Sequence, residues 1–335
     1  MTKQTIMHLI DDATPGGVMR VLDYVTTHRD LTGTMRHKVR QIKRGSLSAP
    51  RLDADLIVSH LAISWRALPF LMQLRALNAR TPMLHVEHSY TAGFVAHNVP
   101  SRLRFHTLLR TAYALFDKIA AVSAAQRDWL ATRELVDPAK LELLRSAVDV
   151  MPFLRLPSVD HPPKVIGAIG RLDAQKGFDT LIRAFRACGR PDLRLEIFGD
   201  GAERAALETL AGNDPRIRFH GHCADQVAIM GSVDVVAIPS RWEAYGLVAL
   251  EARAAGRGVL VSGVDGLADH LRDGAQRVDS TVCGWLTALE ALDKGVLTQT
   301  RRARLRAMRT PEASSQAWGA LIASMIAPQQ TQQAA

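Results

Sequence analysis

The chain has 335 residues, of which 47% are hydrophobic and 22% are charged, a composition that argues against a disordered protein and suits two globular domains. It contains no apolar run of about 18 residues, so we expect no transmembrane helix. The net charge is +9, and residues 1–160 hold +7 of it, from 21 Lys and Arg against 14 Asp and Glu. This basic part suggests an anionic partner such as nucleic acid, an acidic polymer or a membrane surface, with a solvated basic face as the alternative.

The first half of the chain alternates short apolar stretches with amphipathic ones. The stretch at 5–10 is followed by two aspartates and is typical of a buried strand rather than of a signal peptide. Further strands are expected at 54–62, 82–89 and 117–123, and helices at 16–28, 64–79, 101–116 and 124–135. This alternation predicts βαβ units and a parallel sheet.

A proline-rich stretch at 151–164 interrupts this pattern and predicts an extended linker. Beyond it, strands are expected at 165–170, 193–199, 217–222, 233–239 and 258–263, with helices between them. The chain is therefore predicted to form two doubly wound α/β domains, at 1–155 and 164–310. A C-terminal helix at 311–327 would return to the first domain, and the polar tail at 328–335 would be disordered.

Charged residues and glycines follow several of these strands. In "IGRLDAQKG", Arg171 and Lys176 lie between a strand and a helix start, which favours an anion site for phosphate or diphosphate. Two more glycine turns occur at Gly199-Asp200-Gly201 and at Gly16-Gly17, where backbone N–H groups could approach a ligand. A solvated loop or a tight turn explains each of these features about as well when it is taken alone.

Two glutamates stand in the otherwise small and apolar stretch "RWEAYGLVALEARAAG". Glu243 lies in the loop after a predicted strand, and Glu251 lies about one and a half turns into the next helix, so both could point toward one ligand. A carboxylate accepts two hydroxyl hydrogen bonds, which suits a ribose diol or a sugar. The alternative is a surface glutamate and a charge near a helix N-terminus.

The three cysteines and twelve histidines do not predict a metal site. Cys188, Cys223 and Cys283 lack ligand spacing and are expected to be reduced thiols of a cytosolic protein. His220 and His222 form the closest histidine pair, but no further ligand is clustered with them.

Together these motifs resemble the retaining glycosyltransferases of family 4. The resemblance rests on G170-R171-L172-x3-K176-G177, on G199-D200-G201, and on E243-x7-E251 with "YGLVALEA" between them. Gly16-Gly17 with Arg20, and "VEHS" around His88, match as well, so the resemblance covers essentially the whole chain.

The resemblance implies a GT-B fold, in which two Rossmann-like domains face each other across a cleft. Arg171 and Lys176 would hold the donor diphosphate without a metal, and Glu251 would bind the ribose hydroxyls. Glu243 would contact the donor sugar close to the backbone of Gly246 and Leu247. Gly199 and Asp200 would also line the donor site, and Gly16 and Gly17 would close over the phosphates. His88 would act with Glu243 at the reacting centre.

The implied activity is the transfer of a hexosyl or related sugar from a nucleotide diphosphate sugar to an acceptor hydroxyl, in polysaccharide, glycolipid or other glycoconjugate synthesis. No cofactor is implied. The acceptor would be a glycan or glycolipid, and the enzyme would be cytoplasmic, with an anionic membrane surface at the inner face of the membrane as a further partner. The chain departs from the family at "RSAVD", at "GRGVL" and between Asp273 and Trp285, which leaves base recognition open.

Three other functions remain as alternatives. A sugar-nucleotide epimerase could use a similar scaffold, whereas a phosphorylase needs a longer chain and a pyridoxal-bound lysine. A basic module that binds nucleic acid or membrane would show charge without the ordered Arg–Lys–Glu–Glu set. Because aromatic residues make up only 5% of the chain, we expect no nucleic-acid partner.

Overall fold

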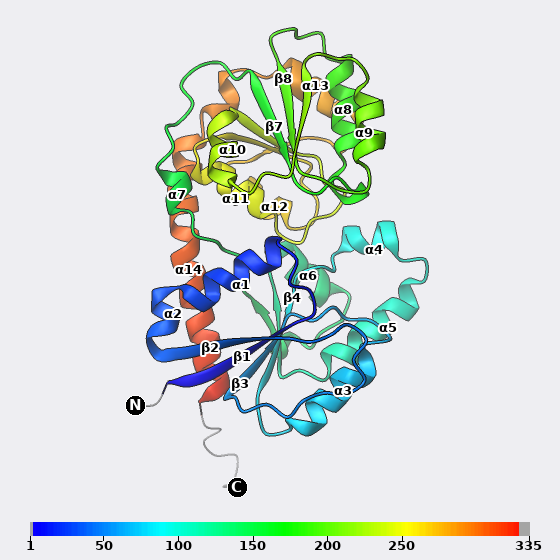
Figure 1. The fold of residues 1–335 in the computed structure, drawn as a ribbon, viewed down its shortest axis with the longest axis vertical. Coiled ribbons are helices and arrows are strands. Elements are labelled where there is room, and N and C mark those ends of the chain that lie inside the picture. The colour runs from blue at the N-terminus through cyan, green and yellow to red at the C-terminus, as the bar shows by residue number, and fades with distance from the viewer. Residues whose placement is uncertain (1–2, 328–335) are drawn as a thin grey trace. The chain divides into compact units, whose positions relative to one another are not determined.

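The computed structural model describes residues 3–327 (Figure 1). The predicted disordered tail at 328–335 lies outside these residues. The chain divides into two compact units. The first contains the chain up to Tyr90, Asn98–Val148 and the chain from Glu312 onward, and the second contains Thr91–His97 and Asp149–Pro311.

The first unit is built on a six-stranded sheet with the order β2-β1-β3-β4-β5-β6, and all of its pairings are parallel. Its strands are β1 (Gln4–Ile10), β2 (Met35–Gln41), β3 (Leu56–Ser59), β4 (Met83–Glu87), β5 (Lys118–Ala121) and β6 (Leu141–Leu143). The helices that precede Val165 in the chain are α1 (Gly17–Thr27), α2 (Arg29–Thr34), α3 (Leu68–Leu77), α4 (Ala92–Asn98), α5 (Arg102–Tyr113), α6 (Ala124–Thr132) and α7 (Met151–Leu154).

The second unit is built on another six-stranded parallel sheet, with the order β12-β11-β10-β7-β8-β9. Its strands are β7 (Val165–Ile169), β8 (Arg194–Phe198), β9 (Ile217–Gly221), β10 (Val235–Ile238), β11 (Gly258–Val261) and β12 (Gln276–Arg277). Helices lie on both faces of this sheet (Figure 1). The helices that follow β7 in the chain are α8 (Phe178–Ala187), α9 (Arg204–Ala211), α10 (Gln226–Ser232), α11 (Leu247–Ala254), α12 (Leu267–Leu271), α13 (Val282–Glu290) and α14 (Thr300–Ile326). The part of α14 from Glu312 onward belongs to the first unit.

Apolar spacing explains how these helices attach to their sheets. In α8, Phe178, Leu181, Ile182 and Phe185 recur at helical spacing, and all four side chains are buried against the second sheet. The strands β10 and β11 of this sheet are apolar and buried along their whole length, as expected for a parallel sheet with helices on both faces. Each sheet therefore has its own core, and loops leave both at the carboxyl ends of the strands.

All nine strands expected from the sequence are present, and the predicted fold class is confirmed. The sequence did not predict β2, whose residues Arg36, Lys38 and Arg40 are charged. β2 is an edge strand with one paired side, so charged residues are tolerated there and protect the open edge from further pairing.

The prediction of an extended linker at 151–164 was partly wrong. The stretch begins with the short helix α7, because Pro152 occupies one of the first helical positions, where its missing N–H costs no hydrogen bond. The final helix α14 contains Pro311, and the grouping of the chain changes from the second unit to the first immediately after this residue.

Candidate active site

The second sheet reverses its strand order between β7 and β10. From β7 the chain proceeds to β8 and β9 on one side, and it returns to place β10 on the other side of β7. Loops that follow two such strands diverge and leave room for a ligand beyond the sheet edge. The loop with Arg171 and Lys176 follows β7, and the loop with Glu243 follows β10.

An ion pair joins these two loops. Lys176 Nζ donates to Glu243 Oε2 over 2.5 Å, with the side chains only 18% and 14% exposed. The Ser240 hydroxyl lies 3.4 Å from the same carboxylate oxygen. Two residues that are 67 positions apart in the sequence are thus brought together at the reversal point.

Arg171 lies in the same loop but remains open to solvent. Its side chain is 76% exposed and lies 3.5 Å from Asp173 Oδ2 and 3.5 Å from Gln175 Oε1. Both contacts are long, so the guanidinium is free to turn toward an anion. Arg171 and Lys176 together give this edge of the sheet two cationic groups.

Gln175 was not predicted from the sequence, although it lies inside the "RLDAQKG" motif. The side-chain amide of Gln175 donates to the backbone carbonyl of Trp242 over 3.0 Å. The backbone carbonyl of Gln175 accepts from the backbone N–H of Arg241 over 2.8 Å. Arg241 in turn contacts both carboxylate oxygens of Asp179, which lowers the pKa of that carboxyl against the opposing effect of burial. These contacts fix the Glu243 loop on the Lys176 loop.

The glycines at Gly199 and Gly246 have a structural requirement of their own. Gly199 has φ +138°, and a Cβ there would lie 1.9 Å from the Gly170 carbonyl oxygen. Gly246 immediately precedes α11 and has φ +94°, and a Cβ there would lie 2.7 Å from Leu267. No larger residue fits either position without a backbone shift, so their presence alone does not report a ligand.

The remaining donor-side residues differ in exposure. The Asp200 side chain is exposed, accepts from the N–H of Gly201 over 2.8 Å and lies 3.4 Å from Arg204. Leu247 is the first residue of α11, so its N–H is among those left open at a helix start. Glu251, in contrast, is completely buried in α11.

A buried arginine supports the loop that precedes α11. Arg253 is 1% exposed and donates to His270 Nδ1 over 3.0 Å, while its other nitrogen lies 3.1 Å from Asp273. Because an arginine can only donate, His270 must carry its proton on Nε2, which donates to the Tyr245 carbonyl over 2.9 Å. This chain of contacts holds the backbone immediately before Gly246.

Gly16, Gly17 and His88 belong to the first unit. Gly16 caps α1, Gly17 is its first residue, and both are exposed in the loop that follows β1. His88 immediately follows β4, at the same carboxyl edge of the sheet. The strand order of this sheet also reverses, between β1 and β3.

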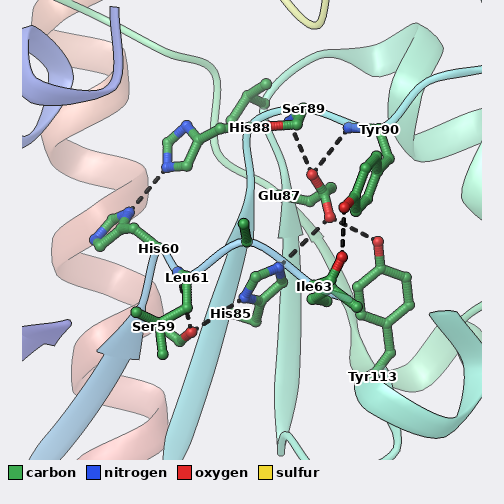
Figure 2. Close-up of polar contacts among 12 residues, drawn as sticks. Ser59, His60, Leu61, Ile63, His85, Glu87, His88, Ser89, Tyr90 and Tyr113 are labelled. Carbon is green, nitrogen blue, oxygen red and sulfur yellow. Dashed lines mark hydrogen bonds and ion pairs between the residues drawn. The ribbon is translucent and has the colours of Figure 1, made fainter. Parts of the chain in front are cut away.

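Glu87 fixes the backbone on either side of His88. Its Oε1 accepts from the N–H groups of Ser89 and Tyr90 over 2.8 and 3.0 Å, and its Oε2 accepts from the Tyr113 hydroxyl over 2.7 Å (Figure 2). Burial alone would raise the pKa of Glu87, but His85 and these N–H groups lower it below its ordinary value. The carboxylate is therefore charged and holds the turn that presents His88.

His88 also contacts a second histidine that was not predicted from the sequence. Its Nε2 lies 2.8 Å from Nδ1 of His60 (Figure 2). Burial lowers the pKa of His88 to about 4, although the charge of Glu87 opposes this. His88 is thus neutral at neutral pH and can offer Nδ1 to a ligand either as a donor or as an acceptor.

Residues 3–327 contain neither a cluster of metal ligands nor a helix that could span a membrane. None of these residues forms a His, Cys, Asp or Glu group of three or more that could hold a metal ion. Within the same range, every helix is too short or too polar to cross a membrane.

Two family models match the chain. Residues 16–151 match the model described as Glycosyltransferase Family 4, and residues 163–297 match the model described as Glycosyl transferases group 1. Each matched range corresponds to one of the two sheets. The first range contains Gly16, Gly17 and His88, and the second contains every donor-side residue from Arg171 to Glu251.

Similar proteins include an uncharacterized glycosyltransferase of Methanocaldococcus jannaschii, 36% identical over 143 residues that make up 41% of this chain and 37% of the relative. A D-inositol 3-phosphate glycosyltransferase of Mycobacterium sp. is 29% identical over 209 residues, or 56% of this chain and 47% of the relative. The matched segment thus spans less than half the length of each of these two relatives.

Among solved structures, HepE of Anabaena, in complex with UDP and glucose, matches with a TM-score of 0.71 and 19% identity over 96% of this chain and 100% of that chain. At this identity the match describes the fold. The motifs, the two family models and the two parallel sheets agree, and the chain belongs to glycosyltransferase family 4, the group 1 glycosyl transferases, with a GT-B fold.

Proposed function

We propose that this protein is a retaining glycosyltransferase that moves a sugar from a nucleoside diphosphate sugar to an acceptor hydroxyl without a metal ion. The observation that supports this most is the ion pair of Lys176 and Glu243 at the strand-order reversal of the second sheet, beside the exposed Arg171. Two cations that would suit a diphosphate thus lie close to a carboxylate that would suit a sugar.

Arg171 and Lys176 would bind the donor diphosphate and stabilise the charge that develops on it as the sugar leaves. The ammonium group of Lys176 has three N–H donors, and its contact with Glu243 leaves others for phosphate oxygens. Preorganised cations stabilise a leaving group most when they are shielded from water, and Lys176 is the more shielded of the two.

The rest of the donor would extend over α11. Glu251 would accept hydrogen bonds from the ribose hydroxyls, and the N–H groups of Gly246 and Leu247 would lie close to the donor, as helix starts favour anions. Glu243 would orient the transferred sugar. Gly199 and Asp200 would border this site on the β8 side.

The first unit would supply the acceptor side. Gly16 and Gly17 would close over the phosphates, and His88 would contact the reacting sugar through Nδ1. The acceptor hydroxyl would attack from the same face that the nucleotide leaves, so that the anomeric configuration is retained. We propose a glycan or glycolipid as the acceptor, on the basis of the family alone.

A panel of nucleotide sugars tests the function. Purified protein is incubated with UDP-, GDP- and ADP-hexoses and a mixture of glycan and glycolipid acceptors, with and without EDTA, and nucleotide release is measured. The uridine donors come first because the similar HepE structure holds UDP. Acceptor-dependent release that persists in EDTA supports the proposal, whereas epimerised sugar nucleotide without release would favour the epimerase alternative.

An anionic membrane surface is a further proposed partner, and α5 supports it. At the start of this helix Arg102, Leu103 and Arg104 are exposed, Leu103 by 77%, and Arg104 lies 5.7 Å from the ring of the partly exposed Trp65. Exposed apolar and basic side chains together suit an anionic lipid surface. This would place the enzyme at the inner face of a cell membrane.

Liposome flotation tests this surface. The wild type should float with anionic vesicles and remain below with neutral ones. An Arg102→Ala, Leu103→Ser, Arg104→Ala variant should lose that difference, while Arg194→Ala, on an exposed site of the second unit, should keep it. Equal flotation with both vesicle types would contradict the proposal.

A further inference from the structure

Four histidines of the first unit form one hydrogen-bonded row. His88 Nε2 lies 2.8 Å from His60 Nδ1 (Figure 2), His60 Nε2 lies 3.0 Å from His8 Nδ1, and His8 Nε2 lies 2.9 Å from His37 Nδ1. Neighbouring ring planes are tilted by only 20–29°, so each ring can direct its nitrogens along the row. The contacts run in a line and do not converge on one point.

The sheet builds this row because its strand order matches the order of the histidines. His37 lies on β2, His8 on β1, His60 directly after β3 and His88 directly after β4, and these strands are consecutive neighbours. His8 is level with Val39 and Val58, so His37 lies two residues before it and His60 two residues after it.

The last step of the row follows the same rule. Ser59 is level with His85, which puts His60 level with Val86 and His88 two residues further on. Because side chains alternate between the faces of a strand, steps of two residues keep all four rings on one face of the sheet. The row is therefore a product of register and not of a chance contact.

The surroundings keep the row uncharged. His8 is completely buried, and the ring of Trp318 lies 6.4 Å from it. Burial, with a smaller effect of His37, lowers the pKa of His8 to about 3, and burial also lowers the pKa of His60 well below its ordinary value. At neutral pH the four rings are therefore neutral.

Counting protons leaves two arrangements of the row. Four neutral rings carry four N–H groups, and each of the three N–H···N bonds uses one of them. The fourth proton must then lie at one end, on His88 Nδ1 or on His37 Nε2. Moving it from one end to the other reverses every hydrogen bond between them.

We propose that this row acts as one unit that sets the tautomer of His88, so that His60, His8 and His37 are positioning residues for the sugar-facing nitrogen Nδ1. The role at the sugar rests on the function proposed above, whereas the coupling of the four rings does not. When a ligand hydroxyl donates to His88 Nδ1, the fourth proton lies on His37. When a ligand oxygen accepts from Nδ1, the proton lies on His88, and no ring in the interior becomes charged.

The far end of the row favours the second arrangement. His37 Nε2 is buried, and no partner within residues 3–327 forms a hydrogen bond with it. A buried donor without a partner is costlier than a buried acceptor without one, so this nitrogen is better left unprotonated. We expect the resting protein to carry the fourth proton on Nδ1 of the half-buried His88.

Nuclear magnetic resonance of protein labelled with ¹⁵N-histidine tests the coupling without any substrate. Long-range ¹H–¹⁵N correlation spectra distinguish protonated from unprotonated ring nitrogens. In the wild type, His88 should be protonated at Nδ1. In His37→Asp, the carboxylate can only accept, so Nε2 of His8 should become the donor. The row should reverse, so that His88 becomes protonated at Nε2, three hydrogen bonds from the substitution.

Two further variants define the result. In His37→Phe the unprotonated Nε2 of His8 would face a phenyl ring and requires no donor, so the wild-type tautomer of His88 should be retained. His106→Phe replaces a partly exposed histidine of the same unit outside the row and should change nothing at His88. A His88 tautomer that is the same in His37→Asp as in the wild type overturns the inference.

Enzyme assays separate this inference from the proposed function. If both hold, His37→Asp should lower kcat by about 10-fold or more, since a catalytic histidine in the wrong tautomer loses most of its effect, while nucleotide affinity stays the same. A reversed tautomer in a protein that turns over no nucleotide sugar would support the coupling and reject the proposed function.

Discussion

Lys176 Nζ donates to Glu243 Oε2 over 2.5 Å and so joins the two loops that diverge at the strand-order reversal of the second sheet. Neither residue can be replaced without changing the surroundings of the other. The roles proposed for them, a diphosphate contact and a sugar contact, are therefore coupled even before a donor binds.

We expect Lys176→Ala to lower kcat/KM by about 10²-fold or more, because it removes a charge from the leaving group. Glu243→Ala should reduce turnover more than nucleotide affinity. The double variant should lose less than the product of the two single losses, since residues in contact are not additive. Steady-state kinetics of all three variants tests this, and independent effects would mean that the ion pair has no part in catalysis.

Arg171→Ala should also lower kcat/KM by about 10²-fold while leaving the melting temperature unchanged, because an exposed cation contributes little to stability. Arg194→Ala is the matched control: this exposed arginine begins β8, at the end of the strand opposite the candidate site. Wild-type turnover in Arg171→Ala would remove this arginine from the diphosphate site.

Glu251→Gln should weaken donor binding. Loss of hydrogen bonds from a charged group to the ribose should weaken nucleotide diphosphate binding by about 1.5–3 kcal/mol. Calorimetric titration with the nucleotide diphosphate measures this effect, and unchanged affinity would contradict the ribose role.

Apolar stretches made the strands predictable from the sequence. Strands that lack such a stretch were not predicted. Every strand with a run of buried apolar residues was predicted from the sequence. The edge strand β2 carries Arg36, Lys38 and Arg40 and has no such run, and β12 has only two residues. Their pairing is a property of the sheet around them, and a local pattern does not contain it.

Site prediction had a similar limit. Motif spacing singled out Lys176 and Glu243, but their contact depends on β7 and β10 being neighbours, which sequence order does not give. The same holds for His8, His37, His60 and His88, which look scattered along the chain because the strand order 2-1-3-4 is what aligns them. A histidine near each of four successive strands was the available signal.

The variant Gly16→Ala tests whether Gly16 contacts the donor or only forms a turn. Gly16 is extended, a conformation open to any residue, and a Cβ there would lie at an ordinary 3.7 Å from the Thr14 carbonyl oxygen. We therefore expect an unchanged melting temperature but a raised KM for the donor, because the methyl group would keep the backbone from the phosphates. Gly33→Ala, a substitution in α2 where a Cβ meets nothing within 4 Å, should leave the donor KM unchanged. A wild-type donor KM in Gly16→Ala would mean that Gly16 forms a turn and does not contact the donor.

Acid should destabilise the first unit through its buried histidines. The pKa of His8 is lowered by burial to about 3 and that of His88 to about 4, against an ordinary value of 6.5. As pH falls below 6.5 the unfolded chain takes up protons that the folded chain refuses, so the free energy of unfolding falls. Each such histidine contributes up to about 1.4 kcal/mol per pH unit until its folded pKa is reached.

Urea unfolding between about pH 7 and about pH 5.5 measures this slope, above the range in which most carboxylates titrate. His8→Asn should make the slope shallower by up to one proton, because the variant has no ring to protonate in the unfolded chain. His222→Asn, which replaces an exposed histidine of the second unit, should keep the wild-type slope. If His8→Asn retained the full slope, the buried row would not be the source of the acid sensitivity, and the neutrality on which its two proton arrangements depend would lose its support.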